Sequence, residues 1–416
     1  MGSGYPGIGA AIGRFGGRTM RGVLGTGRTN GIIGTLVLLV VAVLVAGCTG
    51  AGQSSGRSNS EPAPLAQVSI QPGDKAENVK PTQPASVNVT GGEIREVALT
   101  NTDGKAVAGT LSPDRRSWTS TEPLGYDRTY TWSGTAAGPN SPAVPITGSF
   151  STVKPRQLVH ATLNIGDGDT VGIAAPVILQ FDNHVADKAA VQLALQVQAS
   201  VPAEGSWAWL PDDNGGSRAH YRTREYWEPG TQVNVAAKLY GVAYGDGSYG
   251  EEDLTTTFTV GRAQIVKADV NSHRLIVLRD GQEVMNFPAS YGLASDPQRH
   301  TTNGVHVVMN KSQKVLMSNP KYGYVDLPMY WAVRVSNYGE FIHANPASTG
   351  AQGSTNVTHG CINLSTANAR QYFDSAIFGD PVEVTGSPTQ FSGEHGDIYD
   401  WTVPWDAWQA MSALDS

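Results

Sequence analysis

The segment from Phe341 to Ser365, FIHANPASTGAQGSTNVTHGCINLS, combines two histidines with one cysteine. His343 lies near its start, and His359, Gly360 and Cys361 follow one another near its end. The residues between are mostly small and polar, and they favour turns, so the segment can fold back and bring a histidine against the sulfur. A thiolate is the reactive form of cysteine and needs a neighbouring base. The pattern predicts a nucleophilic Cys361 activated by His343 or His359.

The second cysteine, Cys48, follows a different pattern. Residues 1–30 contain four arginines and no acidic residue, and residues 31–47 form an uncharged, mainly apolar run. A basic start, an apolar core and small residues at the exit are typical of a secretory signal. Val45-Ala46-Gly47-Cys48 resembles a lipobox, so we expect residues 1–47 to target the membrane and Cys48 to be lipidated. The alternative is an uncleaved anchor, because the run approaches the roughly 20 residues of a spanning helix.

Both interpretations place the rest of the chain outside the cytoplasm, anchored to the outer face of the cell membrane. If Cys48 is acylated, Cys361 has no cysteine with which to form an internal disulfide, which makes it a lone thiol.

The composition limits the classes of protein to consider. A chain of 416 residues is long enough for about two to four domains. Its net charge of −7 argues against a nucleic-acid partner, which would require a basic surface. The chain has 49 glycines and 24 prolines but only 16% charged residues, which favours turn-rich β structure over long charged helices.

The chain divides by composition into successive regions. Residues 48–64 are small, polar and proline-containing, which predicts a flexible linker. Residues 65–151 and 152–261 each contain short alternating segments separated by turn residues, as in immunoglobulin-like β-sandwiches. One such segment, residues 191–198, alternates cleanly and predicts a strand.

Aromatic pairs in the second of these regions allow two interpretations. Trp207 and Trp209, like Tyr226 and Trp227, are spaced so that they suit either a sugar-binding surface or a sandwich core. Large rings dominate the cores of such sandwiches, so we favour the core.

Residues 262–386 carry the candidate catalytic segment among further short strands. Residues 365–378 predict a helix capped by Ser365 or Thr366, with Tyr372, Phe373 and Ile377 on one face. Residues 387–416 contain three tryptophans, and we expect this Trp-rich tail to pack onto the catalytic domain.

The catalytic segment resembles a known family signature. His343-Ala344 followed by residues 354–365, STNVTHGCINLS, is similar to the H…(S/T)HGC(I/V)NLS pattern of the YkuD-type L,D-transpeptidase domain of the bacterial envelope. The resemblance covers about residues 263–385. Actinobacterial members also have two immunoglobulin-like domains after a membrane anchor and a similar tail. The implied fold is mainly β, with two sandwiches and a β-rich catalytic domain that has one helix after the cysteine.

The resemblance implies a reaction and roles for residues. Cys361 is expected to attack the third residue of a peptidoglycan donor stem, displace D-Ala and form a thioester, with His343 as base. A side-chain amine of an acceptor stem then completes a 3→3 cross-link. The backbone N–H groups of Gly360 and Cys361 suit the oxyanion, and His359 is expected to shape the pocket beside the sulfur. Further substrate-binding positions are Met317, Tyr324, Ala344, Thr358 and Asn363.

The chain departs from the family pattern at two positions. Similar enzymes often have serine after the base and a tryptophan a few residues later, where this chain has Ala344 and Ala347. Carbapenem β-lactams acylate family members, and we expect the same here. Zinc binding by His343, His359 and Cys361 lacks a fourth ligand at a recognisable spacing, so we expect neither metal nor cofactor.

Two alternatives to the transpeptidase remain. An L,D-carboxypeptidase forms the same acyl-enzyme but uses water as acceptor. A non-catalytic wall-associated lipoprotein keeps the fold without activity, although the intact pattern around Cys361 argues against it.

Overall fold

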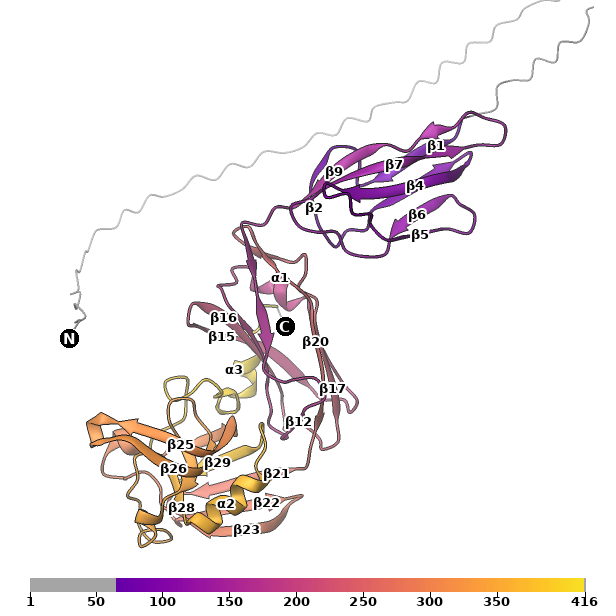
Figure 1. Ribbon diagram of the computed structural model, residues 1–416. Coiled ribbons are helices and arrows are strands. Elements are labelled where there is room, and N and C mark those ends of the chain that lie inside the picture. Colours follow the sequence, from indigo (N-terminus) through magenta and orange to yellow (C-terminus); the bar gives the residue numbers. More distant parts are fainter. Residues whose placement is uncertain (1–64, 415–416) are drawn as a thin grey trace, which may run out of the picture. The chain divides into compact units, whose positions relative to one another are not determined.

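The computed structural model describes residues 65–414, and β-strands dominate it (Figure 1). The signal segment and the whole linker of residues 48–64, with Cys48, lie outside the described residues. Within residues 65–414, no helix has both the length and the apolar character needed to cross a membrane.

The first sandwich has two antiparallel-rich sheets. One sheet has the order β1 (Gln67–Gln71), β3 (Ser86–Thr90), β6 (Ser117–Ser120) and β5 (Gly109–Leu111). The other has the order β2 (Ala76–Val79), β9 (Gly148–Thr152), β7 (Thr129–Ala137) and β4 (Glu93–Asn101), with β8 (Val144–Pro145) beside β7. Trp118 and Trp132 pack edge to face across the sheets at 5.4 Å between ring centroids, which closes the core.

The second sandwich has a similar plan and a third, small sheet. Its sheets have the orders β11 (Ala161–Leu163), β13 (Val177–Phe181), β16 (Gly216–Thr223), β15 (Gly205–Asp213), and β12 (Thr170–Val171), β20 (Leu254–Val260), β17 (Gln232–Ala237), β14 (Leu195–Ala199). The small sheet is β10 (Gln157–Val159), β19 (Ser248–Gly250) and β18 (Ala243–Gly245).

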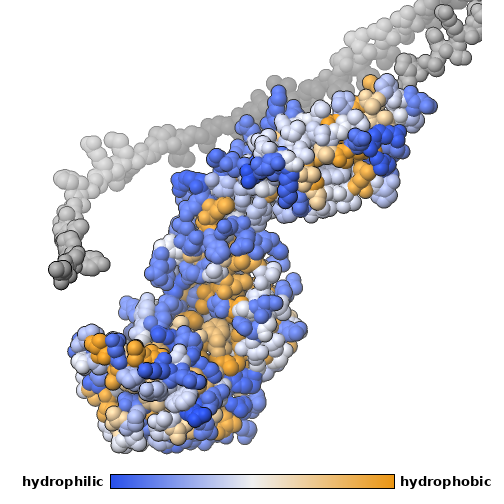
Figure 2. Space-filling view, viewed as in Figure 1, coloured by the Kyte–Doolittle hydropathy of each residue, from blue (hydrophilic) through white to orange (hydrophobic). Residues whose placement is uncertain are grey.

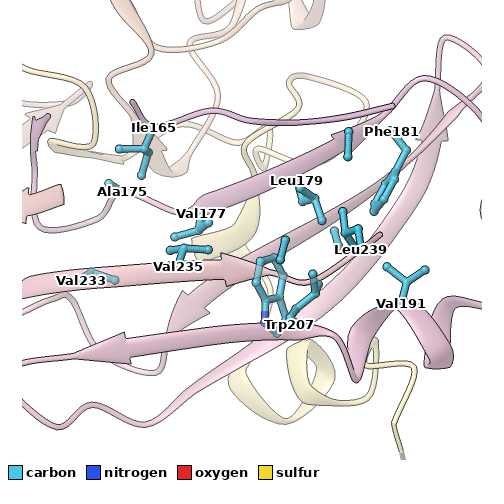
Figure 3. Close-up of a cluster of buried hydrophobic side chains, with 14 of the residues drawn as sticks. Ile165, Ala175, Val177, Leu179, Phe181, Val191, Trp207, Val233, Val235 and Leu239 are labelled. Atoms are coloured by element: carbon cyan, nitrogen blue, oxygen red, sulfur yellow. The ribbon is translucent and has the colours of Figure 1, made fainter. Parts of the chain in front are cut away.

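The core of this sandwich explains its aromatic pairs. Inward-facing residues of both sheets meet in one apolar cluster (Figure 3). Trp207, Trp209 and Trp227 are buried in it, and the Trp227 Nε1–H donates to the Ala175 carbonyl at 3.1 Å. The expectation that these tryptophans are core residues is confirmed.

The predicted strand over residues 191–198 is partly wrong. Its first residues belong to helix α1 (Lys188–Gln192), and β14 begins only at Leu195. The Asp187 side chain caps this helix by accepting a hydrogen bond from the Ala190 N–H at 3.0 Å. Val191 reaches the core from the helix, so the apolar position is satisfied without a strand.

The catalytic domain is built from two sheets. The first has the order β23 (Gln282–Pro288), β22 (Arg274–Arg279), β21 (Gln264–Asp269), β29 (Pro381–Thr385) and β24 (Gly304–Val307). The second has the order β25 (Asn310–Asn319), β26 (Tyr324–Arg334), β27 (Phe341–Ala344) and β28 (Ile362–Leu364). A shared apolar core joins them and includes residues of helix α2 (Thr366–Ser375).

Helix α2 is shorter than predicted. Ser365 caps it, because its hydroxyl accepts from the Asn368 N–H at 3.2 Å. The chain becomes extended at Ala376, so Ile377 does not share the helical face with Tyr372 and Phe373. The buried Asp380 carboxylate instead accepts from the Ile377 N–H at 3.0 Å, which draws the chain away from the helix axis.

Four 3₁₀ turns and a last short helix complete the elements. They are η1 (Pro297–Arg299), η2 (Pro320–Tyr322), η3 (Pro346–Ser348), η4 (Asp400–Thr402) and α3 (Trp405–Gln409).

The prediction for the Trp-rich tail is confirmed in part. Residues 389–398 and Trp401 pack onto the catalytic domain, but the tryptophans also contact the second sandwich. The Arg222 guanidinium of β16 lies over the rings of Trp401, Trp405 and Trp408, at 4.9, 5.2 and 4.9 Å. Beside it the buried His220 ring lies 3.1 Å from the buried Asp400 carboxylate. Cation–π contacts and a buried pair therefore select the sandwich surface, and spacing of tryptophans alone does not encode that choice.

Candidate active site

The register of two short strands brings the catalytic segment together. Strands β27 and β28 are parallel, and His343 lies opposite Asn363. Cys361 immediately precedes β28, so it lies beside the start of β27. The connector returns through turns that are anchored to the first sheet: the Asn356 side chain donates to the Val270 carbonyl at 2.9 Å and accepts from the Tyr291 N–H at 3.0 Å.

Two cavities meet at Cys361. The larger has a volume of about 570 Å³ and the smaller about 330 Å³. Met317, Tyr324, His359 and Cys361 line both. His343 lines the smaller cavity alone, which gives the two sides of the sulfur different chemistry.

His343 is held as a neutral base. Its side chain is buried, and Nδ1 lies 2.9 Å from the carbonyl oxygen of Ala344. Since a carbonyl only accepts, Nδ1 carries the proton and Nε2 keeps its lone pair. Burial lowers the pKa of His343, and the bond to Ala344 opposes this shift only in part. Nε2 is therefore available to take a proton near neutral pH.

Cys361 is a protonated thiol at rest. Its Sγ donates to the Gly339 carbonyl oxygen at 3.5 Å. Burial raises the pKa of Cys361 to about 12; the Glu340 charge adds to the shift, whereas a backbone bond from Phe341 and the Arg334 charge oppose it. With the thiol neutral, attack needs a base at the moment of reaction, and no preformed thiolate is required.

The turn before the nucleophile is fixed by hydroxyl groups. The Thr358 hydroxyl donates to the Cys361 carbonyl at 2.6 Å and accepts from the Gly360 N–H at 3.3 Å. The Thr301 hydroxyl donates to the Gly360 carbonyl at 2.8 Å. Gly360 has φ +111°, a conformation that favours glycine. Thr358 thus positions the turn, and it also lines the smaller cavity, where substrate binding by Thr358 stays a prediction.

His359 lies among aromatic rings. Its ring centroid is 4.6 Å from that of Tyr322 and 5.6 Å from that of Tyr324. Burial and the Arg299 charge lower the pKa of His359, while Asp296 opposes them. Its ring is therefore a neutral part of both cavity walls.

The hairpin of β25 and β26 supplies Met317 and Tyr324. Their strands pair over most of their length, and the Asn319 position lies opposite Tyr324 near the tip. Leu316, Val325 and Leu327 on the same hairpin are exposed. Figure 2 shows apolar surface in the region where Figure 1 places β25 and β26. Burial raises the pKa of Tyr324, so its phenol is neutral and a hydrogen-bond donor.

The remaining expected positions differ in their exposure to substrate. Asn363 lines the smaller cavity, and its amide donates to the Ser348 hydroxyl at 3.2 Å. Its Oδ1 has no hydrogen-bond partner among residues 65–414. Ala344 is buried in β27 and lines neither cavity, so its carbonyl is what serves the site. Ala347 lines the smaller cavity.

Sequence reasoning missed the charged wall of the larger cavity. Arg334 and Glu340 line it, and Thr389 and Glu394 of the tail region close it. Glu340 lies three residues before His343, but its partner Thr302 is 38 residues away, so no local pattern marks the pair.

Two families of known proteins match parts of this chain. Residues 76–243 match a bacterial Ig domain family, and residues 263–384 match an L,D-transpeptidase catalytic domain family. The chain is 54% identical to L,D-transpeptidase 5 of Mycobacterium tuberculosis over 364 residues, which is 88% of this chain and 81% of that protein. It is 37% identical to L,D-transpeptidase 2 of the same organism over 347 residues, 82% of this chain and 83% of that protein.

A solved structure with similarity to this chain is that of the LD transpeptidase LdtMt1 in complex with imipenem. It is 33% identical, covers 54% of this chain and 97% of its own, and superposes with a TM-score of 0.46.

Proposed function

The chain belongs to the L,D-transpeptidase family, and we propose that it forms 3→3 cross-links between peptidoglycan stem peptides through a thioester on Cys361. The observation that carries this mechanism is the meeting of two cavities at Cys361, with His343 in the smaller one. Two substrates can therefore reach one sulfur from different sides.

Acylation requires one proton to move twice. The Cys361 sulfur attacks the carbonyl carbon of the donor's third residue while His343 Nε2 takes the thiol proton. The negative charge on the tetrahedral oxygen falls near the backbone N–H group of Cys361, and near that of Gly360 once its 3.3 Å bond to the Thr358 hydroxyl is released. When the C–N bond breaks, His343 returns the proton to the D-Ala nitrogen. D-Ala leaves with a free amine, and the donor remains as a thioester.

Transfer reverses these roles. The side-chain amine of the acceptor's third residue attacks the thioester carbon, and His343 takes a proton from that nitrogen. The C–S bond breaks, an amide forms, and the proton returns to sulfur. Both the leaving D-Ala and the attacking amine must approach His343, so they use the smaller cavity. The body of the donor occupies the larger cavity.

Other residues shape this path. Met317, Tyr324 and His359 line both cavities and hold the substrates against the sulfur. Thr358 orients Gly360 and Cys361. Asn363 lines the smaller cavity, and its Oδ1 is buried without a hydrogen-bond partner among residues 65–414. A carbapenem presents a strained lactam carbonyl to the same thiol, so imipenem acylates Cys361. Ala347 leaves the entrance of the smaller cavity wider than a tryptophan would.

The location follows from the substrate, because peptidoglycan lies outside the cytoplasm. Cys48 carries lipid, residues 48–64 form the tether, and the sandwiches of residues 65–151 and 152–261 are spacers between membrane and wall. The catalytic domain occupies residues 262–386, followed by the tail of residues 387–416. Labelling of cells with a radioactive fatty acid, compared with Cys48→Ala, tests the anchor: label that persists in the variant contradicts it.

The function is tested with a fragment from residue 65, incubated with disaccharide-tetrapeptide and followed by mass spectrometry. A dimer that has lost one D-Ala and is linked between third residues is the expected product. Tripeptide alone would make the protein an L,D-carboxypeptidase, with water as acceptor. If neither the dimer nor the tripeptide forms, both activities are contradicted.

A further inference from the structure

Glu340 is an acidic residue in the wall of the larger cavity, next to the nucleophile. It directly follows Gly339, whose carbonyl accepts from the Cys361 thiol. A Cβ atom placed on Gly360 would lie 4.0 Å from Glu340 Oε1. The Glu340 charge is also among the causes that raise the pKa of Cys361. The carboxylate therefore lies where a donor stem must pass.

The carboxylate is fixed in place. Its Oε1 accepts from the Thr302 N–H and its Oε2 from the Thr302 hydroxyl, both at 2.8 Å. The Glu340 carbonyl closes a turn by accepting from the Val335 N–H at 3.0 Å. The side chain is only 13% exposed. Each oxygen accepts one hydrogen bond from the described residues. A carboxylate has about four acceptor sites, so acceptor capacity remains for a ligand.

His306, the residue behind Glu340, does not form a hydrogen bond with its carboxylate. The His306 side chain is fully buried, its Nε2 lies 2.8 Å from the Thr302 carbonyl, and its ring stacks on Phe391 at 4.0 Å. Its Nδ1 lies 3.6 Å from Glu340 Oε2 and has no hydrogen-bond partner among residues 65–414. A contact of that length is too long for a good hydrogen bond.

Other cations near the cavity are engaged elsewhere. The Arg334 guanidinium lies over the Phe341 ring at 4.4 Å and faces the carbonyls of Ser336 and Asn337 at 3.5 and 3.3 Å. Among the described residues, Glu340 forms no ion pair with lysine or arginine. A largely buried carboxylate without such a partner is costly unless something compensates its charge.

We propose that Glu340 is a specificity-determining residue that binds the side-chain ammonium group of the donor's third residue. This inference rests on the proposed function, in which the donor occupies the larger cavity. A 3→3 cross-link needs a third residue with a side-chain amine, and in the donor that amine does not react. The donor's ammonium group therefore enters the larger cavity as a cation. Charge-assisted hydrogen bonds to the Glu340 carboxylate would stabilise it there.

The test compares two synthetic tetrapeptide donors that differ in one group. One has lysine as third residue and the other norleucine, which lacks the ammonium. Acylation alone is measured, as the single-turnover mass increase of the intact protein with release of D-Ala, so the acceptor step does not enter. Wild type, Glu340→Gln and Glu283→Gln are compared.

Glutamine suits the Glu340 position, because its oxygen can accept from the Thr302 N–H while its NH₂ faces His306 Nδ1. Glu283→Gln is the control, since Glu283 is an exposed glutamate of the catalytic domain that does not line the larger cavity. We expect Glu340→Gln to slow acylation by the lysine donor about 10- to 100-fold and to change the norleucine rate by less than about twofold. Glu283→Gln should change both rates by less than about twofold.

The failures are distinguishable. Equal slowing of both donors by Glu340→Gln, or no slowing of either, overturns the role of Glu340 in specificity. Absence of acylation by either donor in the wild type contradicts the proposed function itself.

Discussion

The two cavities at Cys361 differ in whether their walls contain charged residues. The wall of the smaller contains His343 and Asn363 but no aspartate, glutamate, lysine or arginine. The wall of the larger contains Arg334, Glu340 and Glu394. A carboxylate beside His343 would favour its imidazolium form, whereas burial keeps it neutral. On the proposed mechanism, proton transfer takes place in the smaller cavity and recognition of the donor by charge takes place in the larger.

The sulfur common to both cavities gives the largest expected effect. Cys361→Ala should lower the rate of D-Ala release by at least about 10⁴-fold, because no nucleophile remains. The melting temperature should change by less than about 2 °C, since the lost thiol makes one weak hydrogen bond. Chromatographic assay of D-Ala and calorimetry check both. Substantial product from the alanine variant would refute the covalent route.

The next largest effect distinguishes His343, which lines only the smaller cavity, from His359, which lines both. His343→Gln keeps a donor for the Ala344 carbonyl but loses the base, so acylation should slow about 10²- to 10⁴-fold. His359→Gln, the control, should slow it less than about tenfold, because His359 forms wall. Stopped-flow acylation by imipenem measures both variants. A larger loss for His359→Gln would exchange their roles.

The pH dependence of acylation sharpens the same comparison. The active pair is a neutral imidazole and a neutral thiol. Since burial lowers the pKa of His343, activity should fall only as the pH drops below its ordinary value of 6.5. Since the pKa of Cys361 is raised to about 12, the rate should stay level from about pH 7 to about pH 10. A tenfold rise per pH unit between pH 7 and 9 would instead reveal a freely titrating thiol.

The smallest effect on activity is expected in the tail. Trp408 is fully buried against the second sandwich, and its Nε1–H donates to the Ser206 carbonyl at 3.0 Å. Trp408→Ala should cost about 3–5 kcal/mol of stability in that sandwich. The acylation rate should change less than about threefold at temperatures where the variant is folded. A large kinetic loss in the folded variant would show that the tail acts on the cavities.

The sequence predicted the parts of the site that lie in one segment. His343, His359, Gly360 and Cys361 share a connector whose turn residues allow it to fold back, and the family signature assigned them; the family and the mainly β fold are confirmed. Alternation of apolar and polar residues also predicted the β character of both sandwiches. It overextended the strand before Leu195, because a capped helix satisfies the same apolar position.

What could not be predicted depends on contacts between distant residues. Glu340 accepts a hydrogen bond from Thr302 and lies 3.6 Å from His306, both earlier in the chain. None of these three residue types is unusual in its own segment. The docking of three tryptophans on Arg222 likewise depends on a surface that exists only after the second sandwich has folded.

We propose that the Cys361 sulfur receives the donor stem from the larger cavity and passes it to an acceptor in the smaller cavity. The most direct test is mass spectrometry of the protein quenched during reaction with disaccharide-tetrapeptide, followed by peptide mapping. The account predicts a thioester on Cys361 whose mass equals the donor less D-Ala, and it predicts that added acceptor amine removes this adduct as dimer forms. Dimer formed without the adduct, or an adduct on another residue, would contradict it.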